Sequence, residues 1–138
     1  MTAITLAAAQ QALAAGVAEA ERIGVAVSVA VLDAGGVLRA FARMDGAEIA
    51  GEVLAVDKAY TAVAHRTSTA ELGALAQPGG ELFGLQANGR GRYVMFGGGL
   101  PVTDGDGTVI GAVGVSGAAV ADDVACAEAA RAALPATG

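Results

Sequence analysis

The residues best suited to proton transfer or to metal ligation lie in one short segment of the sequence. Lys58 and His65 are the chain's single lysine and single histidine, and Tyr60 lies between them. On a helix, Lys58 and His65 lie on one face, two turns or about 10 Å apart along the axis. An amine, an imidazole and a phenol can each move a proton, although a buried lysine needs a lowered pKa to act as a base. The alternative is that Lys58 and His65 are solvated helix residues, with His65 stabilised by the C-terminal end of the helix dipole.

The cationic residues are concentrated in the middle of the chain. Only Arg22 and Arg131 of the 8 cationic residues fall in the terminal helices that the sequence predicts, in a chain whose net charge is -6. Guanidinium groups bind carboxylates through two parallel hydrogen bonds, so this segregation favours an internal anion-binding site. The alternative is that the central cations form surface salt bridges with neighbouring carboxylates. The candidate anion-binding residues are Arg43, Lys58, Arg90 and Arg92.

Consecutive glycines, Gly97, Gly98 and Gly99, precede Leu100 and Pro101. Because they lack side chains, their backbone N–H groups could approach an anionic or carbonyl oxygen and form a nest for a ligand. The alternative is a bend or bulge between strands, where a side chain would clash. We retain the segment Gly97 to Gly99 as a candidate part of the ligand site.

Periodicity predicts a helix, a hairpin and a second helix in the first half of the chain. Apolar residues at helical spacing cover residues 5–23, and Gly24 ends this helix. Alternating valines over 25–31 and the turn 33–36 predict a hairpin into a strand over 37–44, where Arg39, Phe41 and Arg43 share a face. The next helix covers residues 47–66. Its predicted capping box is Asp45 with Glu48, and its predicted core stripe is Ile49, Val53, Val56, Tyr60 and Val63.

The second half of the chain predicts a short helix, a long loop, strands and a closing helix. Ser68 with Glu71 repeats the capping pattern for a helix over 69–76, and residues 77–91 form a glycine-rich loop. Strands are predicted over 93–96, 101–103 and 108–116, the last two joined by a turn at 104–107, and Pro135 ends a helix over 119–134. These elements predict an α+β fold, an antiparallel sheet with flanking helices in three layers or two.

Composition limits the classes of function. A chain of 138 residues forms one domain, residues 1–138, and no apolar run reaches the roughly 20 residues of a membrane span. The N-terminus has no Lys or Arg before its alanine-rich stretch, so we expect a cytoplasmic protein without a secretory leader. The acidic balance argues against nucleic-acid binding. A single Cys126 and a single His65 exclude an internal disulfide and a zinc site within one subunit.

Composition also predicts self-association. Hydrophobic residues make up 54% of the chain and aromatic residues only 4%, so the core consists mainly of small side chains. A small alanine-rich core leaves apolar surface in excess, and subunit interfaces can bury that excess. We therefore expect a homo-oligomer.

Several motifs occur in an order that resembles a known family. They are LDAGGVLRAFARMDGA from Leu32, LAVDKAYTA from Leu54, FGGGLPV from Phe96 and VTDGDGTVIGAVGVSG from Val102. The sequence resembles the HbpS-like or GlcG-like family, which includes the C-terminal domain of PduO-type proteins. The resemblance implies a profilin-like or PAS-like sheet with flanking helices, which agrees with the three-layer reading of the elements.

The resemblance also implies a function. Some members of the family bind haem, which implies a small ligand-binding protein for haem or a related tetrapyrrole, with His65 as a candidate axial ligand of the iron and the arginines receiving the propionates. The alternative is an enzyme without a cofactor that acts on a small carboxylate by isomerase, lyase or hydrolase chemistry. In that case Lys58, His65 or Tyr60 would transfer the proton. In both cases the ligand is a small anion.

A shared anionic pocket predicts that Lys58→Ala weakens ligand binding and leaves the fold intact, whereas Arg22→Ala and Arg131→Ala are silent. Each substitution removes one positive charge, so the comparison separates a local site from a general charge effect. Calorimetric titration with hemin and with dicarboxylates measures the difference. Equal losses in Lys58→Ala and Arg131→Ala, or an unfolded Lys58→Ala protein, would leave Lys58 as a structural residue.

Overall fold

The computed structural model describes residues 3–134 and contains a four-stranded antiparallel sheet. β1 pairs with β2 and with β4, and β4 pairs with β3. Backbone hydrogen bonds close the predicted hairpin turns at 33–36 and 104–107, which confirms both. The strands are β1 (Ser28–Asp33), β2 (Leu38–Arg43), β3 (Gly99–Thr103) and β4 (Val109–Ser116), in the spatial order β2-β1-β4-β3.

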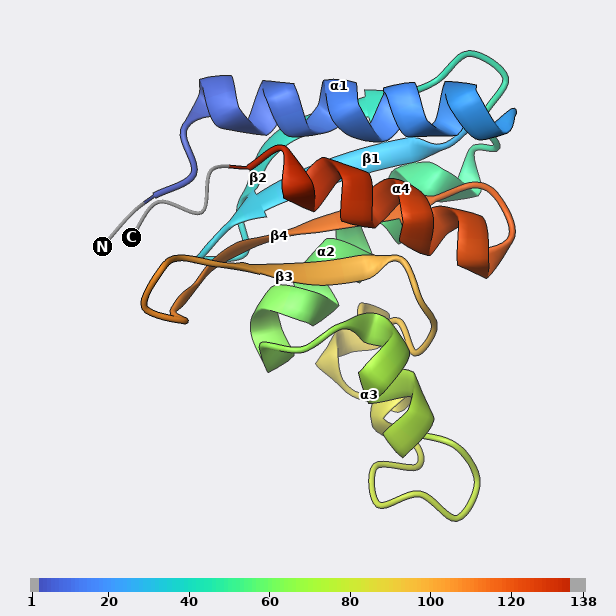
Figure 1. Ribbon diagram of the computed structural model, residues 1–138. Coiled ribbons are helices and arrows are strands. Elements are labelled where there is room, and N and C mark those ends of the chain that lie inside the picture. The colour runs from blue at the N-terminus through green and yellow to red at the C-terminus, as the bar shows by residue number, and fades with distance from the viewer. Residues whose placement is uncertain (1–2, 135–138) are drawn as a thin grey trace.

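Helices cover both faces of this sheet (Figure 1). α1 (Leu6–Ile23) and α4 (Val120–Ala132) pack together on one face, and α2 (Ala50–His65) packs on the other face against β4, β1 and β3. The short α3 (Thr69–Leu75) and the loop that follows it project from the α2 side. The predicted α+β fold with an antiparallel sheet is confirmed, and the helices complete three layers.

Local capping signals place two of the helix ends. Gly24 ends α1 in the left-handed conformation, at φ 79, and its N–H bonds back to the helix carbonyls. The Ser68 hydroxyl accepts a hydrogen bond from the Glu71 N–H at 3.1 Å and begins α3. Both caps confirm the prediction. Pro135, which we expected to end the last helix, lies outside the described residues.

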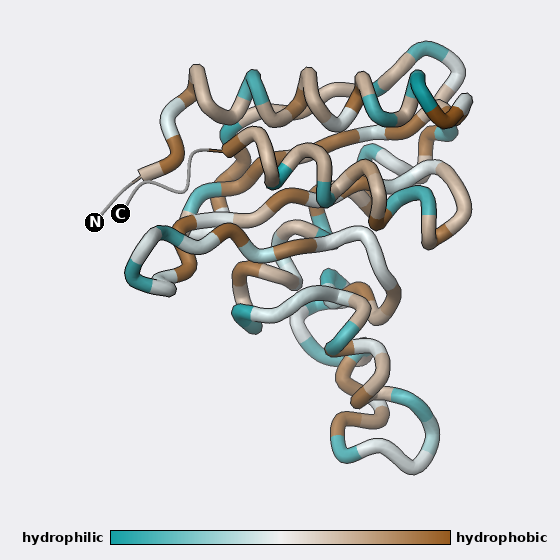
Figure 2. The backbone as a smooth tube through the Cα atoms, in the orientation of Figure 1, coloured by the Kyte–Doolittle hydropathy of each residue, from teal (hydrophilic) through white to brown (hydrophobic). Residues whose placement is uncertain are grey.

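The central strands β1 and β4 are buried on both faces. Valines on one side of these strands, such as Val29 and Val113, pack toward α1 and α4, while Ala30, Leu32 and Ala112 on the other side pack toward α2. Figure 2 shows the hydrophobic residues gathered on the strands between the helices, and hydrophilic residues at the turn between β3 and β4. A strand covered on both faces cannot keep a polar side, which explains the continuous apolar run.

α2 lies directly on the backbone of the sheet. A side chain at Gly114 would overlap the Ala55 carbonyl, and one at Gly99 would overlap the Lys58 carbonyl. Only small residues fit a helix face at this distance, and Ala55 and Ala59 are fully buried there. The glycines of β3 and β4 therefore serve to bring helix and sheet together.

The predicted core stripe of α2 is wrong in its first two members. Ile49 is 77% exposed and Val53 is 62% exposed, while Lys58 and Thr61 face inward and are buried. The helix is rotated relative to the prediction because the close contact with Gly114 selects the alanine face, and Ile49 and Val53 turn away from it. The reading of Lys58 as a solvated helix residue is therefore also wrong.

The predicted capping box of α2 is not formed. The helix begins at Ala50 after Ile49, without a side-chain cap, so Asp45 and Glu48 do not act as the box. Arg43 holds the preceding turn instead, because its Nε and Nη2 donate to the Ala47 carbonyl at 3.1 and 2.7 Å.

The structure differs from the prediction in two further places. Residues 93–96, predicted as a strand, run beside α2 without joining the sheet, and the loop before them contains the short 3-10 turns η1 (Leu85–Ala87) and η2 (Gly89–Gly91). In β2, the pairing register shifts so that Leu32 faces Leu38 and Val31 faces Ala40. This bulge interrupts the alternation at Arg39, so the expected common face of Arg39, Phe41 and Arg43 is wrong for Arg39.

Lys58 connects the two helical layers through the end of the sheet. Its Nζ donates to the Val115 carbonyl at 2.9 Å and forms an ion pair with Asp123 of α4 at 3.1 Å. The other oxygen of Asp123 accepts the Ala118 N–H at 2.9 Å. Both side chains are buried, and burial lowers the pKa of Lys58 from its ordinary value, while the negative charges of Asp123 and Glu48 oppose that shift.

Gly98 leaves the space that this lysine occupies. It has φ 128, and a side chain there would lie 2.7 Å from Lys58 Nζ. Its carbonyl accepts the Val115 N–H at 2.9 Å, so the bend continues the pairing of β3 with β4. The bend and Lys58 therefore lie together, as parts of one packed contact.

We expect Lys58→Ala to lower the free energy of unfolding by about 3–5 kcal/mol, because it leaves the Asp123 carboxylate buried without its partner. This replaces the expectation that Lys58→Ala leaves the fold intact, which assumed a residue outside the core. Urea unfolding followed by circular dichroism measures the loss. Arg131→Ala on the exposed side of α4 is the control, and we expect it to change stability by no more than about 0.5 kcal/mol.

A double-mutant cycle tests the pairing itself. Lys58→Met combined with Asp123→Asn should cost less than the sum of the single substitutions, because neither charge is then left alone. Additive losses would show that the two side chains do not stabilise each other.

Candidate functional site

His65 lies at the C-terminal end of α2 with a defined ring orientation. Its Nδ1 is 2.9 Å from the Thr61 carbonyl oxygen, and its ring meets the edge of Tyr93 with centroids 4.4 Å apart and planes at 77°. A carbonyl oxygen only accepts, so the proton of the neutral ring is on Nδ1 and the lone pair is on Nε2. Among the described residues, no protein group forms a hydrogen bond with that Nε2. The half-buried imidazole therefore presents a free basic nitrogen.

Tyr60 and Arg92 extend this arrangement. The rings of Tyr60 and Tyr93 are stacked with centroids 6.4 Å apart, and the Arg92 guanidinium lies 3.6 Å from the centroid of Tyr60. Arg92 Nε also pairs with Asp57 at 3.0 Å, so its charge is already balanced. We call the residues Asp57, Tyr60, His65, Arg92 and Tyr93 the His65 cluster.

Thr61 fixes the two segments that form the His65 cluster. Its hydroxyl donates to the Asp57 carbonyl at 2.7 Å and accepts the Val94 N–H at 3.0 Å, and its carbonyl orients His65. One buried side chain thus holds the irregular segment 92–94 against α2, which explains why this segment needs no strand partner.

An apolar pocket of about 350 Å³ lies beside the His65 cluster and shares Tyr93 with it. Such a lining, with few polar groups, suits a largely apolar ligand. Its walls are Leu54, Gly91, Tyr93, Val94, Met95 and Phe96.

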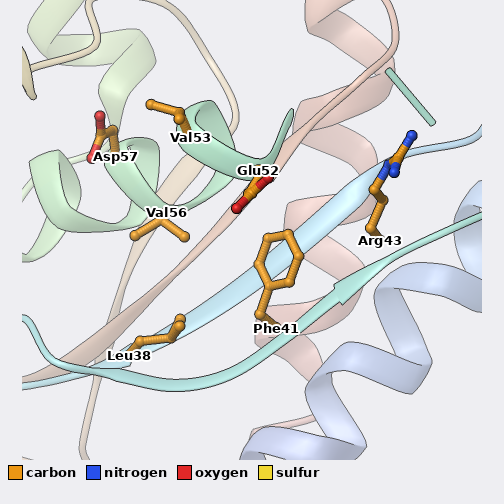
Figure 3. Close-up of a pocket in the computed structure, with 7 residues that line it drawn as sticks. All are labelled: Leu38, Phe41, Arg43, Glu52, Val53, Val56 and Asp57. Carbon is orange, nitrogen blue, oxygen red and sulfur yellow. The ribbon is translucent and has the colours of Figure 1, made fainter. Parts of the chain in front are cut away.

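The structure brings together only part of the predicted site. His65, Tyr60 and Arg92 lie in one cluster, and Arg90 stands in the adjacent η2 turn, exposed and with a left-handed φ of 58. Lys58 and the bend Gly97 to Gly99 form the buried contact with Asp123. Arg43 lines a different groove, between β2 and α2 (Figure 3). The predicted cations are therefore spread over separate contacts.

Sequence reasoning did not select Tyr93 or Asp123, and it counted Arg66 only among the central cations. Tyr93 was read as a strand residue, and no local pattern relates it to His65 across the intervening loop. Arg66 follows His65 directly, has a left-handed φ of 54, is exposed, and forms no ion pair within residues 3–134. Its position next to the only histidine was a usable signal.

The fold places the chain among a group of similar solved structures. Protein OrfY of Klebsiella pneumoniae superposes with a TM-score of 0.94 at 41% identity, covering 100% of this chain and 95% of that chain. The PduOC complex with haem gives a TM-score of 0.91 at 37% identity, covering 99% of this chain and 100% of that chain. The structure of HbpS gives 0.86 at 36% identity, covering 98% of this chain and 92% of that chain.

A family model described as haem degrading protein HbpS-like matches residues 4–132. The chain therefore belongs to the HbpS-like family, which confirms the resemblance of its motifs. A 15.0 kDa protein of the dhaT-dhaS intergenic region of Citrobacter freundii is 46% identical over 91% of this chain and 87% of that protein. The corrinoid adenosyltransferase PduO of Salmonella typhimurium is 41% identical over 87% of this chain but only 35% of that protein.

Two features are absent from residues 3–134. No helix there has the length and apolar character of a membrane span. No group of three or more His, Cys, Asp or Glu side chains there is placed to hold a metal ion.

We expect Arg92→Ala to change the tyrosine fluorescence and to lower stability by about 1 kcal/mol, because it removes a half-exposed ion pair and a cation over an aromatic ring. The chain has 2 tyrosines and no tryptophan, so all of its emission comes from Tyr60 and Tyr93. Emission spectra and urea unfolding measure both effects. Arg131→Ala is the matched control, and unchanged emission in Arg92→Ala would contradict the stacked arrangement.

Proposed function

We propose that this protein binds haem or a related tetrapyrrole, with His65 as an axial ligand of the iron. The observation that carries the proposal is the ring orientation of His65, whose Nδ1 donates to the Thr61 carbonyl and whose Nε2 is free. Haem-ligating imidazoles need this tautomer, and a hydrogen-bond acceptor at the other nitrogen fixes the orientation of the ring. Family membership and the haem complex of the similar PduOC structure support the same ligand.

The surroundings of His65 fit a tetrapyrrole. Tyr93 and the apolar pocket beside it offer aromatic and aliphatic surface to a flat ring system. Arg90 is exposed, adjoins the His65 cluster and has no carboxylate partner within the described residues, so it is suited to a propionate. Arg92 is bound to Asp57 and covers Tyr60, so we assign it to shaping the pocket.

The residues around His65 have roles in the proposed site that follow from their contacts. Thr61 holds the imidazole through its carbonyl, and Tyr93 limits rotation of the ring from its edge. Tyr60 lies under the Arg92 guanidinium and stacks on Tyr93, and it thereby holds the Tyr93 ring in place. Haem, when bound, would supply redox-active iron; the chain supplies the ligand nitrogen, the apolar walls and the cationic rim.

The alternative of an enzyme without a cofactor receives less support. Its proposed base, Lys58, is buried, paired with Asp123 and bonded to the Val115 carbonyl, so its ammonium has no free face toward a substrate. A base must reach the proton that it removes. We therefore assign Lys58 and the bend Gly97 to Gly99 to the fold, and not to the ligand site.

Two further parts of the proposal rest on the composition. We propose that the protein acts in the cytoplasm, which suits a chain with a single cysteine, and that it acts as a homo-oligomer, which suits its apolar excess. The ligand of the proposed function is a small anion, because the propionates of a tetrapyrrole are carboxylates.

We expect the wild-type protein to shift the Soret band of hemin on binding and to lose tyrosine emission, because both tyrosines lie in the His65 cluster. His65→Gln keeps a polar side chain of similar length but removes the ligand nitrogen. It should shift the Soret band and weaken binding by on the order of 10-fold or more. Absorption and emission titrations measure both changes.

Arg131→Ala provides the control for these titrations, because it removes a charge from an exposed position on α4. An unchanged Soret position and affinity in His65→Gln would rule out His65 as the axial ligand. A wild-type protein that neither shifts the band nor loses tyrosine emission would overturn the haem proposal itself.

A further inference from the structure

A groove between β2 and α2 is separate from the apolar pocket beside His65 (Figure 3). The Phe41 ring stands between strand and helix, with Arg43 and Glu52 toward one end of the groove and Leu38 toward the other. Its volume is about 420 Å³. We call it the β2–α2 groove, and its lining consists of Leu38, Phe41, Arg43, Glu52, Val53, Val56 and Asp57.

Exposed apolar side chains gather around this groove. Val53 on α2 is 62% exposed and Leu38 on β2 is 48% exposed. Ile49, one helical turn before Val53, is 77% exposed. Exposed apolar side chains that line a groove on a small domain are a mark of an interaction surface.

β2 is also an edge strand of the sheet, because the strand order ends with it. Its bulge at Arg39 interrupts a regular ladder, and charged or bulged edges disfavour pairing with another strand. The groove is therefore suited to side-chain packing rather than to extension of the sheet.

The charged groups of the groove have opposite signs and no mutual partner. Arg43 donates Nε and Nη2 to the Ala47 carbonyl, which leaves Nη1 for another acceptor. Glu52 is exposed, and neither residue forms an ion pair within residues 3–134. A surface that carries one cation and one free carboxylate around an apolar centre is complementary to itself under two-fold rotation.

We propose that the β2–α2 groove is an isologous interface with a second copy of this chain. In this interface Arg43 of each subunit faces Glu52 of the partner subunit, and the apolar side chains of the groove pack across the two-fold axis. The inference specifies the surface of the proposed homo-oligomer and does not depend on haem binding.

Charge reversal tests the interface directly. Wild-type protein at micromolar concentration should be an oligomer with an even number of subunits. Arg43→Glu or Glu52→Arg alone should halve the molar mass, because an isologous interface joins subunits in pairs. The double variant Arg43→Glu with Glu52→Arg should restore the mass, since the charges are exchanged on both sides. Light scattering coupled to size exclusion measures all of these masses.

Two variants keep the test decisive. Arg43→Glu also loses its bond to the Ala47 carbonyl, whereas the Glu52 side chain is exposed and forms no ion pair within residues 3–134, so Glu52→Arg separates loss of assembly from loss of fold. Arg22→Glu, on the exposed part of α1, makes the same charge change as Arg43→Glu away from the groove and should leave the mass unchanged.

The mass measurements distinguish failure of the homo-oligomer from failure of this interface. A monomeric wild type would overturn both the homo-oligomer and this interface. An oligomeric wild type whose mass survives Glu52→Arg, or a double variant that is folded but stays as small as the single variants, would overturn the interface and leave the homo-oligomer standing. Hemin titration of the wild-type protein tests the proposed haem site independently of these masses.

Discussion

The buried ion pair of Lys58 with Asp123 is the contact on which the arrangement of the layers depends. It joins helices that lie on opposite faces of the sheet, at an end where Gly98 leaves room for the lysine side chain. Removing two charges from water is costly, and the cost is offset only if the remaining hydrogen bonds of both groups are satisfied. The Val115 carbonyl and the Ala118 N–H supply them. The pair thereby holds α2 against the sheet in the rotation that its contact with Gly114 selects.

The rotation of α2 in turn determines the two surfaces that we assign to function. Because Lys58 and the alanines face the sheet, Val53 and Val56 turn toward β2 and form the groove there. At the other end of the helix, the same rotation brings Tyr60 and His65 against the loop that carries Arg92 and Tyr93. A helix placed by its larger apolar residues would have buried the groove and separated His65 from Tyr93.

The helix caps and hairpin turns could be predicted from the sequence, because each depends on only a few neighbouring residues. Gly24, Ser68 and the hairpin turns act locally, so their patterns were sufficient, and His65 with Tyr60 could be selected by residue type. The rotation of α2 was not predictable from periodicity, because it depends on Gly114 in a distant strand. The hydrogen bond from the Val94 N–H to the Thr61 hydroxyl and the contact of His65 with Tyr93 join residues on either side of a long loop. No spacing in the sequence predicts them. The sequence groups the arginines by their position in the chain. In the structure they lie apart, because Arg43 binds the Ala47 carbonyl and Arg92 pairs with the Asp57 carboxylate.

Asp57 links the proposed interface to the proposed ligand site. Its side chain lines the β2–α2 groove and also holds Arg92, which covers Tyr60. A second subunit packed in the groove would change the solvation of Asp57 and therefore the strength of its pair with Arg92, since an ion pair is screened less as water is excluded. A stronger pair would hold Tyr60 more firmly beside Tyr93. Coupling between two sites is reciprocal in free energy, so a ligand that favours this arrangement of Tyr60 would favour assembly by the same factor.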